Sequence, residues 1–257
     1  MLVVKYGGNA MGAGSAAFIA ECADLVREGL QIVLVHGGGP QIDSALRRAG
    51  VEDRRIAGLR VTDAATLDIT EQVLCGQVNK ALVRAFAARG VSAVGISGQD
   101  GGSIIAGPIA PVDGISLGFV GEVHLIETRL IRCLLDGGFV PVIAPLGISA
   151  DASVRYNLNA DTAAGAIAGA LKADPYVVVT DVPRVRRDPH DPASGIDALS
   201  LAEAKTLLEA GAFDGGMRPK MLAVFAALEG GASRAVIAGG DGALQRALRG
   251  EGTIVTR

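Results

Sequence analysis

The sequence predicts an α/β protein in which helices sandwich a central, mainly parallel sheet, arranged as two lobes. Short runs rich in Val and Ile alternate with longer stretches in which apolar residues recur every three or four positions. Such alternation of strands and helices is typical of a parallel sheet. Hydrophobic residues make up 49% of the 257 residues, so the chain can bury a sizeable core.

Seven segments have the composition expected of strands. Each is a short β-branched or apolar run, most of them followed by the glycine, proline or aspartate that commonly ends a strand. They lie at 2–8, 31–39, 92–98, 139–147, 175–182, 234–240 and 253–257.

The longer stretches at 15–30, 63–90 and 159–173 are predicted to be amphipathic helices that cover the sheet. Glycine, proline and short apolar pairs interrupt this alternation at 107–127, which favours β-hairpins that could form a lid over a substrate. The polar, proline-rich segment 184–195 is expected to be a surface loop.

A boundary between the lobes is expected near residues 172–174, where a long helix ends and a new strand begins. The N-terminal lobe would then comprise residues 1–172 and the C-terminal lobe residues 173–257.

The composition argues against several classes of function. The chain has 24 Lys and Arg against 27 Asp and Glu and no Trp, so it lacks the basic excess and the stacking side chains of nucleic-acid-binding proteins. No apolar run approaches the roughly 20 residues that span a bilayer. Three widely spaced cysteines indicate neither a disulfide framework nor a zinc site. We therefore expect a cytoplasmic protein with a small-molecule partner.

Glycine loops follow the first two predicted strands. Lys5 is followed by Gly7-Gly8, and the second run ends in Gly37-Gly38-Gly39. Because glycine has no Cβ, its N–H can approach a phosphoryl oxygen closely, and a following helix adds positive potential. The alternative is that these glycines only permit tight turns. Neither loop has the spacing of a P-loop or of a dinucleotide fold, so a nucleotide would be held differently.

Three polar residues precede the helix predicted at 159–173. Asn157, Asn159 and Asp161 occupy alternate positions, and helix capping explains one of them. Three such residues are more than one cap requires, and all three could instead project toward a site from an extended segment. Lys220 follows the flexible pair Gly215-Gly216, although a solvated lysine at a helix start is the simpler interpretation.

Arg60 could bind a carboxylate through its planar guanidinium, or lie on the surface. His36 ends a strand and could serve only a turn, while His124 and His190 have no partners at metal-ligand spacing, so we assign no metal site. No Ser/His/Asp or Cys/His arrangement indicates a nucleophile. These features fit phosphoryl transfer by positioning and charge.

Nine motifs follow one another along the chain: KYGGNAM, VHGGGPQID, GLRVTD, CGQVNKAL, GISGQDGG, GFVGEV, NLNADTAAGAIA, TDV and GGMRPK. Together they resemble the N-acetylglutamate kinases of the amino-acid kinase family, from Lys5 to the C-terminal GEGTIV. The resemblance implies the fold of that family. It also implies ATP-dependent phosphorylation of the γ-carboxylate of N-acetyl-L-glutamate, the second step of arginine biosynthesis through acetylated intermediates.

The resemblance also implies a role for each matching residue. Lys5 and Lys220 would neutralise the transferring phosphoryl group, and Asp161 would orient the two lysines rather than act as a base. Arg60 would hold the α-carboxylate of the substrate, and Asn157 would bind the substrate as well. The backbone N–H groups of Gly8 and Gly38 would hold the phosphoryl group, and those of Gly38 and Gly39 would bind the substrate.

By the same resemblance the C-terminal lobe binds ATP, with Thr180, Asp181 and Val182 near the nucleotide. Relatives commonly continue with a small-residue loop that contains glycine, whereas residues 183–187 read PRVRR here. Mg²⁺ would be held mainly by ATP phosphates and water, because the sequence shows no carboxylate cluster for it.

Arginine-inhibited relatives carry an extra N-terminal helix that interlaces dimers into a hexamer. Here the first strand follows Met1 directly, and the C-terminal segment 239–257 is shorter than in many sensitive relatives. We therefore expect a homodimer that arginine does not inhibit.

Two other functions stay open. One is the kinase of lysine biosynthesis that acts on aminoadipate attached to a carrier protein, although the segment around Arg60 looks more like the acetylglutamate type. The other is a non-catalytic nucleotide sensor, which would be expected to have lost Lys5, Lys220 or Asp161.

Overall fold

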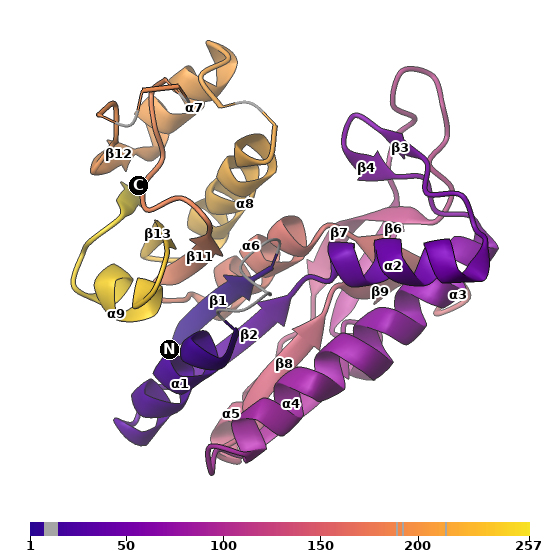
Figure 1. Cartoon of the computed structure of the whole chain (residues 1–257), viewed down its shortest axis with the longest axis horizontal. Helices are drawn as coiled ribbons and strands as arrows, with labels where there is room; N and C mark the ends of the chain where they lie inside the picture. The colour runs from indigo at the N-terminus through magenta and orange to yellow at the C-terminus, as the bar shows by residue number, and fades with distance from the viewer. Residues whose placement is uncertain (8–14, 189, 192, 214) are drawn as a thin grey trace.

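The computed structural model describes residues 1–7, 15–188, 190–191, 193–213 and 215–257. Its centre is an eight-stranded sheet in the order β12-β14-β13-β11-β1-β2-β8-β5 (Figure 1). The strands of this sheet are β1 (Leu2–Tyr6), β2 (Ile32–His36), β5 (Ala93–Ser97), β8 (Val140–Ala144), β11 (Tyr176–Thr180), β12 (Ala198–Ser200), β13 (Arg234–Gly239) and β14 (Thr253–Thr256).

The sheet is parallel except where β13 pairs with β14. Every residue of β1, β2, β8 and β11 is buried, as expected for parallel strands that helices cover on both faces. The expected fold class is confirmed. The sheet is mainly and not wholly parallel because β14 runs antiparallel to β13.

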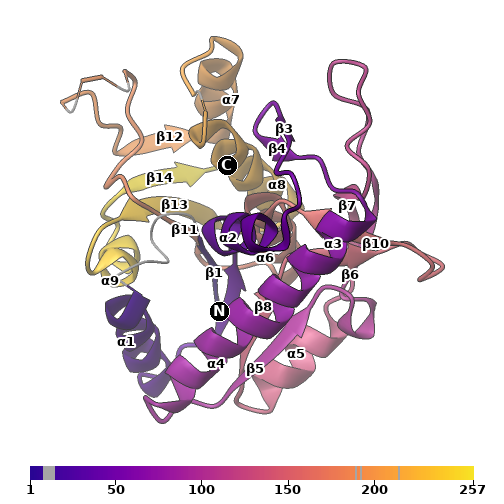
Figure 2. The ribbon, with the colours of Figure 1, turned by 45° about the vertical axis from the view of Figure 1, so that its right-hand side comes forward.

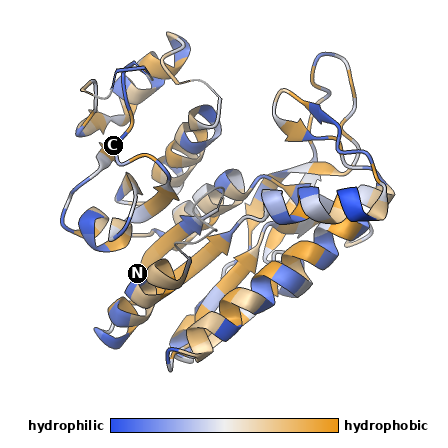
Figure 3. Cartoon of the chain, in the orientation of Figure 1, coloured by the Kyte–Doolittle hydropathy of each residue, from blue (hydrophilic) through white to orange (hydrophobic). Residues whose placement is uncertain are grey.

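Two layers of helices cover the sheet (Figure 2), and each layer buries its own hydrophobic cluster against one face. Successive strand residues point to opposite faces, so the alternating residues of each inner strand divide between the two clusters. One layer consists of α5 (Arg129–Asp136), α6 (Ala160–Leu171), α7 (Leu201–Glu209) and α8 (Met217–Gly230). The other consists of α1 (Ser15–Arg27), α2 (Gly39–Ala49), α3 (Ala64–Glu71), α4 (Asn79–Ala87) and α9 (Ala243–Leu248). Figure 3 shows the inner strands as the most hydrophobic elements.

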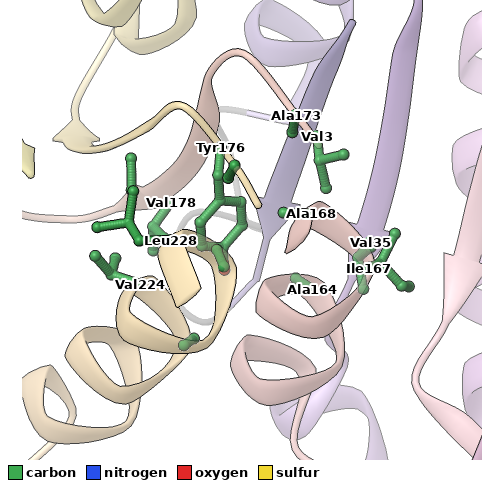
Figure 4. Packing of buried hydrophobic residues seen from close by; sticks show 14 of the residues in the cluster. Val3, Val35, Ala164, Ile167, Ala168, Ala173, Tyr176, Val178, Val224 and Leu228 are labelled. Carbon is green, nitrogen blue, oxygen red and sulfur yellow. The ribbon is translucent and has the colours of Figure 1, made fainter. Parts of the chain in front are cut away.

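Helices α6 and α8 pack with their backbones in close contact. A Cβ on Gly165 would lie 2.3 Å from the carbonyl oxygen of Ala223, and one on Gly169 would lie 2.9 Å from the Cα of Gly230. Figure 4 shows the strand residues that cover this pair, among them Tyr176. Small residues at the crossing therefore set the distance between the two helices.

Four further strands form a small closed barrel beside the sheet. They are β6 (Ile104–Pro108), β7 (Val120–Ile126), β9 (Leu146–Ile148) and β10 (Arg155–Leu158). The hairpin expected within 107–127 is present as the antiparallel pair β6–β7, although β6 begins earlier, at Ile104. The strand expected at 139–147 is confirmed as β8 over Val140–Ala144, but its continuation beyond Ala144 in the same strand was wrong. The chain leaves the main sheet at Pro145, which has no N–H for a ladder, and continues as β9 of the barrel.

The helix expected at 63–90 is not a uniform α-helix. It consists of α3, the π-helical segment Gln72–Val78 and α4. A π-helical segment widens the turn and changes which residues face inward; here it brings Asn79 into the interior, where it is 1% exposed. Apolar periodicity could not reveal this change.

A two-stranded hairpin made of β3 (Arg55–Ile56) and β4 (Leu59–Arg60) extends from the sheet's carboxyl end. Its turn residues, Ala57 and Gly58, both have positive φ, as the tight type I′ turn requires. The hairpin and α8 both lie in the upper half of the molecule in Figures 1 and 2.

Strand β11, which follows the expected lobe boundary, pairs directly with β1. The segments 1–172 and 173–257 therefore contribute strands to one continuous sheet. Within the described residues no helix is both long enough and apolar enough to cross a membrane.

Candidate active site

The first components of the site lie where the central strands end. Lys5 is the penultimate residue of β1. Gly37 and Gly38 follow β2 directly, and Gly39 is the first residue of α2. Asp161 is in the first turn of α6, after the barrel strand β10. In a parallel sheet the carboxyl ends of the strands meet at one edge, where ligands commonly bind. The sequence-predicted residues are thus brought together by topology.

Lys5, Asp161 and Lys220 form one charged cluster. The Lys5 Nζ lies 3.1 Å from Asp161 Oδ1, and the Lys220 Nζ, from α8, lies 3.7 Å from Asp161 Oδ2. Asp161 Oδ1 is buried, so water screens its attraction to the Lys5 ammonium group only weakly. One carboxylate therefore holds two ammonium groups at the same place.

Burial dominates the electrostatics of Lys5, which is 4% exposed. Loss of hydration lowers the pKa of Lys5 below its usual 10.5, the Asp161 carboxylate opposes this shift, and the charge of Lys220 adds to it. A buried cation without its carboxylate would be costly, so Lys5 depends on Asp161 for its charge.

The three polar residues before α6 have different structural roles. Asn157 lies on β10, whereas Asn159 is the N-cap, and its Oδ1 accepts hydrogen bonds from the N–H groups of Asp161 at 2.8 Å and Thr162 at 3.1 Å. The idea that all three project from an extended segment was therefore wrong, because the helix has already begun at Asp161. Capping orients the first turn and thereby the Asp161 carboxylate.

A cavity of about 290 Å³ opens beside the charged cluster. Its walls come from the glycine loop, the β3–β4 hairpin, the barrel strands and the starts of α6 and α8. Among its lining residues are Lys5, Gly37, Gly38, Gly39, Arg60, Leu74, Asn157, Asp161 and Lys220. Gly8, which was also predicted to bind the phosphoryl group, lies outside the described residues.

Arg60 stands at the hairpin side of this cavity and is 9% exposed. Its guanidinium forms ion pairs with Asp43 of α2 and Asp53. Desolvation raises the pKa of Asp43, but hydrogen bonds and charge from Arg60 and Arg55 outweigh it, so the pKa lies below 3.8. The arginine is thus held between two carboxylates.

Sequence reasoning missed Thr62, which connects Arg60 with Asn157. The buried Thr62 hydroxyl donates to the Arg60 carbonyl at 3.0 Å and accepts from Asn157 Nδ2 at 3.2 Å. A buried threonine looks like any core residue in the sequence, so only its place in the GLRVTD motif could have indicated it.

A second cavity, of about 380 Å³, adjoins the charged cluster from the C-terminal lobe. It is lined by Gly7, Thr180, Asp181, Val182, Gly216, Met217 and Lys220. Lys220 lines both cavities. The unusual segment 183–187 borders neither; Pro183, Arg184 and Arg186 line a separate hollow together with Arg246.

No group of three or more His, Cys, Asp or Glu within the described residues could hold a metal ion. Lys220, which lines both cavities, and the backbone N–H groups along them suit a phosphate, and Arg55 and Arg60 add positive charge to the first cavity.

An α/β sandwich with paired lysines between two cavities at the carboxyl edge of its sheet has the architecture of a small-molecule kinase. The chain belongs to the amino acid kinase family, whose model matches residues 1–239. The family predicted from the motifs is thereby confirmed.

The similar proteins agree. The chain is 45% identical to the acetylglutamate kinase of Methanopyrus kandleri, with 99% of this chain and 100% of that protein covered. It is 42% identical to the acetylglutamate kinase of Symbiobacterium thermophilum, covering 100% and 91% of the two chains. Among solved structures, N-acetylglutamate synthase from Neisseria gonorrhoeae, in complex with coenzyme A and N-acetyl-glutamate, superposes with a TM-score of 0.81 at 27% identity. This chain covers 59% of that synthase and is itself covered completely.

Proposed function

We propose that this protein is an acetylglutamate kinase, which transfers the γ-phosphoryl group of ATP to the γ-carboxylate of N-acetyl-L-glutamate in arginine biosynthesis. One observation carries the proposal: Lys220 lines both cavities, and Lys5 and Asp161 stand beside it. A phosphoryl group passing from one cavity to the other would move past both ammonium groups. Relatives named acetylglutamate kinase at 42% and 45% identity over the whole chain support the choice of substrate.

In this mechanism a γ-carboxylate oxygen attacks the γ-phosphorus. The new O–P bond forms as the bond to the β,γ-bridging oxygen breaks, and ADP leaves with that electron pair. The attacking carboxylate is already ionised at neutral pH, so no base is needed, and positioning and charge supply the catalysis. Lys5 and Lys220 would neutralise the moving group, and Asp161 would hold both lysines in place.

Backbone N–H groups would complete the phosphoryl site. Those of Gly38 and Gly39 lie at the start of α2, where the helix adds positive potential, and Pro40 contributes none. We assign the same role to Gly8 on the motif alone, since it is not among the described residues.

Arg60 and Asn157 would bind the substrate at the far side of the first cavity. They line the same wall and are connected through Thr62. The planar guanidinium of Arg60 suits an α-carboxylate, and the amide of Asn157 could hydrogen-bond either the same carboxylate or the acetylated nitrogen.

The second cavity would receive ATP, with Thr180, Asp181 and Val182 along one wall. In this division residues 1–172 bind the acyl substrate and residues 173–257 the nucleotide. Mg²⁺ bound to ATP supplies further neutralisation of phosphate charge. It would be held mainly by the phosphates and water.

The proposal is tested by ADP release from MgATP with N-acetyl-L-glutamate, free glutamate or carrier-linked aminoadipate. Turnover of N-acetyl-L-glutamate alone is expected. Activity only with the carrier-linked substrate would assign the chain to lysine biosynthesis, and no activity with any of the three would favour a nucleotide sensor. The homodimer stays a prediction, which light scattering of the same preparation checks.

The role of Lys220 is tested by the variant Lys220→Met, and Lys205→Met in α7 is the control. Lys205 is an exposed lysine of the same lobe that forms an ion pair with Glu229 at 2.5 Å. Loss of turnover in the first variant and its retention in the second is the expected pair of results. Equal activity of the two variants would contradict the role of Lys220.

A further inference from the structure

A chain of buried polar contacts adjoins the glycine loop. His36 ends β2 and is 0% exposed, and Asn79, the first residue of α4, is 1% exposed. His36 Nδ1 lies 2.8 Å from the carbonyl oxygen of Gly37, and His36 Nε2 lies 3.1 Å from Asn79 Nδ2. Neither residue borders the cavity.

The contacts determine the tautomer of His36. A carbonyl oxygen can only accept, so Nδ1 must carry the hydrogen that it donates to Gly37. Nε2 is then free to accept from the Asn79 amide. The same Asn79 nitrogen also lies within hydrogen-bond distance of the Val142 carbonyl at 2.9 Å and the Ile96 carbonyl at 3.3 Å. Burial lowers the pKa of His36 to about 4, and the nearby charge of Lys80 adds to the shift, so the ring stays neutral at ordinary pH.

Because the peptide bond is planar, the contact between His36 and the Gly37 carbonyl also determines the direction of the Gly38 N–H. In a trans peptide the C=O and the following N–H point in opposite directions. When His36 holds the Gly37 carbonyl inward, the Gly38 N–H must point outward, toward the cavity that Gly38 lines. Gly37 N–H is held by Tyr6 O at 2.9 Å, and Gly38 O by Ile42 N–H at 2.9 Å.

Gly38 N–H is the remaining polar group of this unit, and it has no hydrogen-bond acceptor among the residues that the structure describes. It is therefore available to a ligand oxygen. Its direction is determined by neighbours that do not touch the ligand.

The π-helical segment packs directly against this loop. A Cβ on Gly38 would lie 2.7 Å from Leu74 Cδ2, so the loop rests directly on that segment. Asn79 fills the space beside Gly95, where a Cβ would lie 1.8 Å from Asn79 Oδ1. Lys80 Nζ donates to Asn79 Oδ1 at 3.2 Å and to Gly95 O at 2.8 Å. Packing and hydrogen bonds thus leave the Asn79 amide one orientation.

We propose that His36 and Asn79 are positioning residues that aim the Gly38 N–H at the transferring phosphoryl group. This inference rests on the proposed kinase function. Neither side chain touches substrate; they act through the peptide between Gly37 and Gly38. The direction of the Gly38 N–H depends on the neutral Nδ1–H tautomer of His36.

Two substitutions separate this role from general packing. In His36→Asn the side-chain amide can occupy the place of Nδ1 and still donate to Gly37 O, whereas in His36→Gln it reaches the place of Nε2 and loses that contact. We expect kcat of the Gln variant to fall on the order of 10- to 100-fold, as for loss of an oxyanion donor, with KM for both substrates changed far less. The Asn variant should keep about tenfold more of kcat than the Gln variant. His124→Gln, on a histidine whose side chain is 53% exposed on β7, is the control.

The tautomer can be read in the unmodified protein, because the chain has only three histidines. Imidazole ¹⁵N spectra should show His36 as the neutral Nδ1–H form from pH 6 to 9, with its signals assigned by their loss in either variant. An Nε2–H or protonated His36 would overturn the inference, whether or not the variants fold.

Equal kcat in folded His36→Asn and His36→Gln variants would also overturn the positioning role, because it would mean that His36 contributes only to packing. Failure of the proposed function is a separate result: the unmodified protein would then release no ADP with N-acetyl-L-glutamate. Turnover by the unmodified protein with no selective loss in His36→Gln would leave the kinase assignment intact and refute only the positioning role.

Discussion

Lys5 is a cation in the interior of the protein, and its surroundings explain why it can remain one. Its ammonium group is separated from solvent and lies 3.1 Å from the Asp161 carboxylate. Lys220 shares the same carboxylate at 3.7 Å, so two positive charges depend on one negative charge. Such a cluster has excess positive charge at the place where a phosphoryl group would pass, which is the arrangement that phosphoryl transfer requires.

Replacing Asp161 by Asn tests this organising role. The variant keeps the shape of the side chain but leaves Lys5 buried with no carboxylate partner in contact, so the lysines should separate or lose charge. We expect kcat to fall on the order of 100-fold or more, with a much smaller rise in KM. Steady-state ADP release measures both, with Asp151→Asn in the exposed turn before β10 as control. A variant that mainly raises KM would contradict the organising role.

His36 predicts a specific dependence of stability on pH. Its pKa is about 4 in the folded protein against 6.5 in the unfolded chain, so below pH 6.5 the unfolded chain binds a proton that the folded chain does not. The free energy of unfolding should therefore decrease as pH falls from 6.5 to about 4, with a slope of at most about 1.4 kcal/mol per pH unit from this residue.

Urea denaturation at a series of pH values measures that slope, and His36→Gln should remove this component from it. Other acidic groups contribute equally to both proteins, so the difference between them isolates His36. Identical slopes would show that His36 is not held neutral.

At the scale of elements, the crossing of α6 and α8 places the charged cluster. Asp161 begins α6 and Lys220 lies in the first turn of α8, so the distance between these helices sets the distance between the two charges. Glycines at the crossing allow the close approach, as at Gly165 against Ala223. A wider separation would move Lys220 away from Asp161.

Gly165→Ala should force these helices apart. The new Cβ would lie 2.3 Å from a backbone oxygen that no rotamer change can move. We expect a loss of stability of about 1–3 kcal/mol from overpacking, together with reduced kcat. Urea denaturation and ADP release are the measurements. Gly76→Ala, on an exposed glycine where a Cβ meets nothing within 4 Å, is the control and should be close to neutral.

On the scale of the whole molecule, the two expected lobes share one sheet. β11 of the C-terminal segment pairs with β1 of the N-terminal segment over four residue pairs, from Val3↔Tyr176 to Tyr6↔Val179. Both hydrophobic clusters also contain residues from each segment. Neither segment can therefore bury its own core alone.

We accordingly expect the protein to unfold in one cooperative step. Differential scanning calorimetry should give a calorimetric enthalpy equal to the van't Hoff enthalpy, provided that unfolding is reversible. Expression of residues 1–172 alone should yield no folded product. Two resolved transitions, or a folded isolated segment, would contradict a shared core.

The motifs predicted much of the site because strand ends carry chemistry in this kind of fold. Lys5, Gly38, Arg60, Asn157 and Lys220 were found from glycine, charge and order along the chain, and they line a common cavity. Thr62 and Asn79 were not assigned a role, because their importance lies in contacts with distant backbone. The break at Pro145 and the π-helical segment were missed because apolar periodicity is the same on either side of them.

The sequence by itself determined the α/β class, the strands of the central sheet apart from β12, and the identity of the charged residues. These follow from local periodicity, glycine placement and motif order, which are properties of the chain within short windows. The tertiary structure alone decided that Asp161 lies between two lysines 215 positions apart, since Lys5 comes from β1, Asp161 from α6 and Lys220 from α8. It also decided the tautomer of His36 and the direction of the Gly38 N–H, because both depend on how the His36 ring is held between Gly37 O and Asn79, and Asn79 is remote in sequence.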